Sequence, residues 1–293
     1  MKEKLSYLPP VILVLALCAI GFCLLHYESE YLWKVQELNL FLDTPLFLKQ
    51  QMVTSGWLLT WLGTYFTEFF FHPWQGVLLL LCWWVLMMWL MARTFRVPMK
   101  WSVVLLVPVA SLLLADVGVG YWVYYLKLRG FFFAATIGVT MAVAAVWLYR
   151  LLPSRLLLRP VYIVVITAVL YPLAGFYGLL AALVMGVLAW RLPDMSLWQK
   201  ILATIVALLT IAAVPLVYYR YVFCQTNMVN IYWTGLPLFV MDQEYHVYYT
   251  PYYIIVAFVV ILAALYGTRR VTAVRRPLLW GVLQLAVIGV LAF

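Results

Sequence analysis

The chain has 293 residues, of which 68% are hydrophobic and only 10% are charged. Soluble domains are about 45–50% apolar and about 25% charged, so this composition excludes a soluble globular protein and predicts a multi-pass membrane protein. The net charge of +9 does not indicate a nucleic-acid partner, because the basic residues fall in short clusters between apolar runs.

The apolar runs predict an all-α membrane helix bundle of about nine spans in a single domain, residues 1–293. The first run is interpreted as a retained helix, because HYESEYLW follows it instead of the small residues of a signal-peptide cleavage site. The fifth and sixth runs are short and joined by YPLAGFYG, so they form either two spans or a re-entrant hairpin. The predicted spans are 8–25, 75–92, 101–116, 131–149, 159–174, 176–191, 199–218, 252–267 and 278–293.

The distribution of charge predicts a cytoplasmic N-terminus. With that orientation most of the 19 basic residues fall in inner segments, as the positive-inside rule requires. Most acids and all three histidines then fall outside, which concentrates the side chains capable of acid–base chemistry on one face. The inner segments are 1–7, 93–100, 150–159, 191–200 and 268–277.

Two further features bound the interpretation. The four cysteines have neither disulfide nor metal-ligand spacing, so no metal site is predicted from them and no cofactor is indicated. The final sequence LLWGVLQLAVIGVLAF has no polar cap, which leads us to expect that the natural chain continues into an external C-terminal domain.

The first external loop, residues 26–74, is far longer than a turn requires. Its alternating aromatic and acidic residues are typical of helices that lie at the membrane interface. Asp43-Thr44-Pro45 indicates a helix break and restart. A further helix is predicted from Gly56 to Phe71, capped by Thr54-Ser55-Gly56 and stopped by His72-Pro73.

This last helix carries Thr60, Thr64, Glu68 and His72 at steps of four, which places them on one side. The stripe faces water while the aromatics sit among lipid head groups, or it faces a cavity in which a desolvated Glu68 pairs with His72. A third alternative is a metal site completed by the distant His26 and His246.

Two other external places carry candidate residues. The second long loop, 219–251, contains Arg220 and the alternating set Asp242, Glu244 and His246, which share one face if the segment is extended. That set is either a solvated turn or part of a site. Asp116 ends the third span, and we expect Lys127 or Arg129 to neutralise it.

The stretches VQELNLFLDTPLFL and WLGTYFTEFFFHPWQGVLLLLCWW resemble the opening of an uncharacterised family of multi-pass membrane proteins from Bacteroidota. The similarity covers about residues 30–90, and members of that family have an external region after the membrane part. It implies membership of a membrane-protein family and no particular activity.

The chain also resembles C-type glycosyltransferases, which transfer sugars from polyprenyl-phosphate carriers. The likeness lies in an inner N-terminus and a long first external loop that contains interfacial helices and an acid. The adjacent Asp-Glu signature of those enzymes is absent, and Glu28-Ser29-Glu30 is the nearest approach to it. The likeness is therefore one of architecture.

These observations favour a glycosyltransferase-like enzyme of envelope glycan assembly on the outer face of the bacterial inner membrane, with a polyprenyl-phosphate-linked sugar as donor. Glu68, Glu37 or Asp43 would be the base, with His72 as partner. Asp116, Asp242, Glu244, His246 and Arg220 are the predicted substrate-binding residues. A scaffold that docks a partner membrane protein is the main alternative, and a transporter is the third. The enzyme requires an outward cavity lined by at least two of the external carboxylates.

Overall fold

The computed structural model describes residues 8–118, 120, 123–153, 155, 157–223, 227–237 and 245–267. These residues form helices joined by turns, and this part of the chain contains no strand. In chain order the helices are α1 (Leu8–Tyr27), α2 (Ser29–Leu38), α3 (Pro45–Gln51), α4 (Trp57–Thr67), η1 (Glu68–Phe71), α5 (Pro73–Phe95), η2 (Met99–Leu105), α6 (Leu106–Val117), α7 (Val123–Leu126), α8 (Phe131–Leu151), α9 (Leu158–Ala174), α10 (Phe176–Ala189), α11 (Leu197–Tyr221), η3 (Met228–Asn230) and α12 (Tyr245–Leu265).

Six of the described helices are long and apolar enough to cross a membrane. They are α1, α5, the continuous η2–α6 helix, α8, α11 and α12, and each coincides with a predicted span. The two short predicted spans appear as α9 and α10, with 17 and 14 residues, joined only by Gly175. At about 1.5 Å per residue, α10 is about 21 Å long, shorter than a hydrocarbon core of about 30 Å. The ninth predicted span, 278–293, lies outside the described residues.

Several helix ends follow from local sequence chemistry. The predicted break at Asp43-Thr44-Pro45 is confirmed, because α3 begins at Pro45 and the Thr44 hydroxyl accepts a bond from the Phe47 amide at 3.2 Å. The predicted stop at His72-Pro73 is also confirmed. The predicted side-chain cap of α4 is wrong. Gly56 is the N-cap residue, and the neighbouring Ser55 is buried instead of capping the helix.

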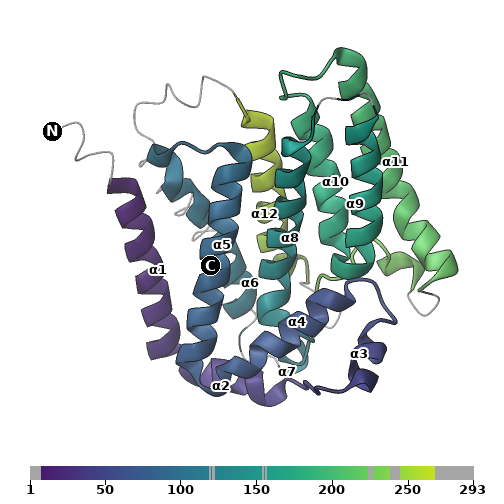
Figure 1. Cartoon of the computed structure of the whole chain (residues 1–293). Coiled ribbons are helices and arrows are strands. Elements are labelled where there is room, and N and C mark those ends of the chain that lie inside the picture. The colour runs from purple at the N-terminus through teal and green to yellow at the C-terminus, as the bar shows by residue number, and fades with distance from the viewer. Residues whose placement is uncertain are drawn as a thin grey trace.

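The bundle has two ends of different composition (Figure 1). The loop end carries α2, α3, α4 and α7, which lie across it, together with residues 227–237. The basic end carries the connections 95–99 and 190–197 and the described residues of the connection between α8 and α9. Its described cations include Arg93, Arg96, Arg150, Arg159, Arg191 and Lys200. This separation agrees with the predicted division of charge. Which end faces the cytoplasm stays a prediction from the positive-inside rule.

Helix α8 is the centre of the bundle. Its most apolar stretch is 78% buried, whereas the corresponding stretches of α1 and α11 are 17% and 22% buried. The apolar surfaces of α1 and α11 therefore remain for lipid, as expected for peripheral spans. Helix α10 is buried along most of its length between α8, α9, α11 and α12.

Helix α4 crosses the start of α8 at a contact between two glycines. A Cβ atom on Gly63 would lie 2.7 Å from the carbonyl oxygen of Gly130, and one on Gly130 would lie 2.8 Å from the Cα atom of Gly63. Gly130 also has φ +67, a left-handed conformation that favours glycine. The approach of these two backbones fixes the first loop onto the bundle.

At the basic end, Arg159 joins three segments of chain. It is 2% exposed, and its Nη2 atom donates to the Leu152 carbonyl at 2.8 Å and to the Asp194 carboxylate at 2.6 Å. Its guanidinium also lies over the Tyr149 ring, 5.8 Å from the centroid. Burial opposes the ionised form of Asp194, but the hydrogen bond and charge of Arg159 outweigh it and hold the pKa of Asp194 below its usual value.

The Gly63–Gly130 contact predicts a specific sensitivity at Gly130. Gly130→Ala should lower the apparent Tm of the purified protein, because a left-handed alanine costs about 1–2 kcal/mol and overpacking adds about 1–3 kcal/mol. Gly120→Ala is the matched control. Gly120 has φ +61, and a Cβ there meets no described atom within 4 Å. Tryptophan fluorescence during heating measures both variants, and equal shifts would contradict the close contact.

The Arg159–Asp194 pair predicts loss of stability in acid. Because the folded-state pKa of Asp194 is lowered, the pair stabilises the fold above the unfolded pKa of about 3.9 and stops doing so as the pH falls through the folded value. Asp194→Asn should lower the free energy of unfolding by only about 1–2 kcal/mol at neutral pH. The loss is small because water screens a carboxylate that is 43% exposed. Glu37→Gln breaks the exposed Lys34–Glu37 pair and should change the Tm little. Equal effects of the two substitutions would refute the structural role of Arg159.

Candidate functional site

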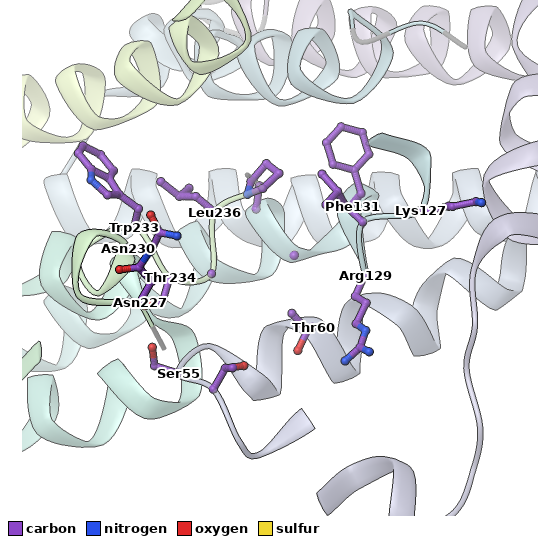
Figure 2. A pocket seen from close by; sticks show the side chains of 16 residues that line it. Ser55, Thr60, Lys127, Arg129, Phe131, Asn227, Asn230, Trp233, Thr234 and Leu236 are labelled. Carbon is purple, nitrogen blue, oxygen red and sulfur yellow. The ribbon is translucent and has the colours of Figure 1, made fainter. Parts of the chain in front are cut away.

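A cavity of about 460 Å³ opens at the loop end. Helix α4, the turn between α7 and α8, and residues 227–237 form its walls (Figure 2). The volume is within the range of sites that hold small molecules or head groups. The lining residues are Thr54, Ser55, Thr60, Lys127, Leu128, Arg129, Phe131, Ala134, Ala135, Asn227, Asn230, Trp233, Thr234, Gly235, Leu236 and Pro237.

Arg129 supplies positive charge to the cavity. Its Nη1 atom donates to Oε1 of Gln51 at 3.3 Å, and the Thr60 hydroxyl donates to the same oxygen at 3.3 Å. Gln51 is 3% exposed, so its packed amide orients the guanidinium. A guanidinium carries five donor hydrogens, and this single bond leaves donors available for a ligand. Lys127 is exposed, and its side chain points away from the asparagines (Figure 2).

The opposite wall combines amides, a hydroxyl and an indole. Asn227, Asn230, Trp233 and Thr234 lie together on the far side of the cavity from Arg129 (Figure 2). Oδ1 of Asn227 accepts from the Val229 amide at 3.3 Å, which begins η3 and holds this segment in a compact turn. Such a wall offers hydrogen bonds to hydroxyl groups and an aromatic face to a sugar ring or an acyl chain.

No described carboxylate lines the cavity, so the expectation of two acids there is not met among these residues. Glu68 lies elsewhere, with Oε1 accepting from Asn39 at 2.6 Å and Oε2 accepting from Gln36 at 3.1 Å. The four residues predicted to share one side of the helix lie in different environments. Thr60 lines the cavity, Thr64 is buried, Glu68 faces α2, and His72 is exposed with its ring against Phe71.

The other predicted residues are scattered. Glu37 pairs with Lys34 at 2.7 Å on the surface, Asp43 is exposed, and Arg220 lies over the Tyr221 ring. Asp242 and Glu244 lie outside the described residues. His246 is in the first turn of α12, so the segment is helical there and not extended. Within the described ranges no three His, Cys, Asp or Glu side chains are placed to hold a metal ion. The catalytic and binding roles of all these residues stay predictions.

Asp116 is buried, with 1% of its surface exposed. The expectation that Lys127 or Arg129 neutralises it is wrong, because neither carboxylate oxygen has a hydrogen-bond partner and Arg129 bonds to Gln51 instead. The physical reason is that the side chain lies inside the bundle, whereas the two basic side chains are exposed at its end.

Together these features define an all-helical membrane protein with a polar, cationic cavity at one end. The chain belongs to the family of unknown function DUF6057, whose profile matches residues 4–290. No curated protein and no solved structure matches it. Membership of an uncharacterised family agrees with the expectation from residues 30–90 and extends over nearly the whole chain. The likeness to C-type glycosyltransferases has no support from these comparisons and stays a prediction.

The polar wall of the cavity was not among the predicted sites. The stretch TNMVNIYWTG contains two asparagines and two threonines within a loop otherwise dominated by tyrosines. That local enrichment in amides was the available signal. The role of Gln51 had no signal in the sequence, because it depends on a contact with Arg129, far along the chain.

The bonds around Glu68 predict a structural effect of Asn39. The Asn39 amide donates both to Glu68 and, at 2.9 Å, to the Thr64 carbonyl, so Asn39→Ala should destabilise the loop end by about 2–3 kcal/mol. Gln36→Ala removes one longer bond and should cost less. Thermal unfolding measures both variants, and proteolysis of the first loop locates the change. A Tm unchanged by Asn39→Ala would contradict this arrangement.

Proposed function

We propose that this membrane protein binds an anionic head group that also carries hydroxyls, in the class of polyprenyl-phosphate-linked sugars, at its loop end. The observation that carries the proposal is the cavity itself, with Arg129 on one side and amides on the other. Within the described chain no ion pair occupies Arg129 or Lys127. Guanidinium groups bind phosphate oxygens through paired, charge-assisted bonds.

The sugar part of the proposed ligand is supported by the opposite wall. The Asn230 amide offers a donor and an acceptor to sugar hydroxyls, and Trp233 offers an apolar ring face. The Thr234 hydroxyl donates to the Ile231 carbonyl at 3.4 Å and so offers an acceptor. The polyprenyl chain of the ligand would follow the apolar surface of Phe131 and Leu236 toward the lipid. With the predicted orientation, this site is on the outer face of a bacterial inner membrane.

Only binding is proposed for this site, without sugar transfer. A transferase needs a general base within hydrogen-bond reach of the acceptor. Glu68 is engaged by two amides and lies outside the cavity lining. No contact among the described residues favours the scaffold or the transporter over ligand binding, so neither is proposed.

Binding is tested with the full chain in lipid nanodiscs, using quenching of tryptophan fluorescence by added polyprenyl phosphate. Arg129→Gln should weaken binding about 10–100-fold, because it removes charge-assisted bonds of about 1.5–3 kcal/mol. Lys49→Gln is the matched control, since Lys49 of α3 is an exposed cation at the same end and outside the lining. Polyprenol, which has the same tail without phosphate, should bind far more weakly.

A second comparison tests the wall that contains Asn230 and Trp233. Asn230→Ala should weaken binding of the sugar-bearing carrier more than binding of polyprenyl phosphate alone. Equal binding of polyprenol and polyprenyl phosphate, or an Arg129→Gln variant as tight as the original chain, would refute the proposal. A phosphate dependence without any sugar dependence would limit the ligand to the carrier.

A further inference from the structure

A second, smaller cavity of about 100 Å³ lies between α10 and α11. Its walls are aliphatic except for Trp190 and Thr204, which lie toward the basic end of the two helices. The helices are in close contact at small residues, because a Cβ atom on Gly186 would lie 3.2 Å from the Cβ atom of Ala207. These small residues leave an apolar groove along the junction of α10 and α11.

The groove is open to the lipid side of the bundle. Helix α11 forms one edge of the bundle (Figure 1), and its most apolar stretch is only 22% buried. Leu183 and Leu208 belong to the groove lining and are both exposed. An engineered cavity of about 150 Å³ is known to bind benzene, so this smaller volume admits a short run of methylene groups. In a bilayer the occupant of such a groove is part of an acyl chain.

The polar end of the groove is fixed by two hydrogen bonds. The Trp190 indole donates to the Thr204 hydroxyl at 2.8 Å, and that hydroxyl donates to the Lys200 carbonyl at 2.9 Å. Trp198, in the first turn of α11, is 78% exposed. Tryptophan rings concentrate at the depth of the lipid head groups. This end of the groove therefore lies where a head group would be.

The same end has an excess of positive charge. Arg191 ends the last turn of α10 and is exposed, and Lys200 is in the first turn of α11. Asp194 is the acid of the connection 190–197, and Arg159 already pairs with it at 2.6 Å. Within the described chain neither Arg191 nor Lys200 forms an ion pair. These two cations are therefore available to an anion from outside the protein.

We propose that the groove between α10 and α11 binds one anionic phospholipid, with an acyl chain against Leu183 and Leu208 and its phosphate at Arg191 and Lys200. An apolar groove that ends in two cations complements a lipid that joins an acyl chain to a negatively charged head group. A zwitterionic lipid fits the groove equally well but carries its own compensating cation. The site is at the opposite end from the larger cavity, so this inference does not depend on the proposed function.

Photolabelling of the full chain in phosphatidylcholine nanodiscs tests the head-group part of the inference. A trace of phosphatidylglycerol with a diazirine in its acyl chain should label residues 183–190 and 204–211, as located by peptide mass spectrometry. The labelling should exceed that by diazirine phosphatidylcholine about 10–30-fold, because each of two cations strengthens binding about fivefold. Arg191→Gln combined with Lys200→Gln should remove most of this preference. Arg93→Gln, which alters an exposed cation at the same end and outside the groove, should keep it.

A matched pair of substitutions tests the acyl-chain part. Leu208→Trp adds bulk to a residue of the groove lining and should reduce labelling of the groove severalfold. Leu209→Trp makes the same change at the next residue of α11, which is outside the lining. Leu208 and Leu209 are similarly exposed, at 57% and 63%, so neither substitution overpacks the core. Leu209→Trp should leave the labelling of the groove unchanged.

Four results would overturn the inference. The first is equal labelling of the groove by phosphatidylglycerol and phosphatidylcholine in the original chain. The second is an Arg93→Gln variant that loses as much of the preference as the doubly substituted chain. The third is an equal effect of the two tryptophan variants. The fourth is loss of labelling when excess glycerol phosphate is added, which would make the site one for a soluble phosphate ester.

Discussion

The structure depends on backbones that touch without side chains between them. At Gly63 and Gly130 the main chains of α4 and the start of α8 meet directly, and any Cβ atom would separate them. A second such contact lies nearby, where the Gly56 amide donates to the Pro172 carbonyl at 2.8 Å. These contacts bring the long first loop down onto the bundle. Without them Thr60 could not form a wall of the cavity.

The polar chemistry of the protein is divided between two depths at the loop end. The cavity holds fixed donors and a guanidinium that remain in contact with water, where charge is inexpensive. Asp116 lies deeper, in a place where charge is costly and a neutral acid is not.

The membrane architecture was largely predictable because apolar runs must be helical and long to cross a bilayer. The breaks at Pro45 and Pro73 were predictable for the same kind of local reason. The site was not predictable, because its contacts join residues far apart in the chain. Helical spacing placed Glu68 and His72 on one line, but the helix tightens to 3-10 geometry at Glu68. The amides of Gln36 and Asn39, at the end of α2, bind the Glu68 carboxylate.

The hydrogen bond at the tip of the α9–α10 hairpin has a consequence for the order in which the molecule is assembled. This tip is the junction at Gly175, where α10 begins. The first amide of α10, that of Phe176, donates at 2.7 Å to the carbonyl of Thr234, which lies beyond α11 in the chain. During biosynthesis this hairpin therefore emerges with its tip lacking a partner. The Thr234 carbonyl is synthesised only after α11 has been synthesised and inserted. Until then the Phe176 amide is hydrated or contacts the translocation machinery. Completion of this part of the bundle is thus a late event, set by the segment that also forms the cavity wall.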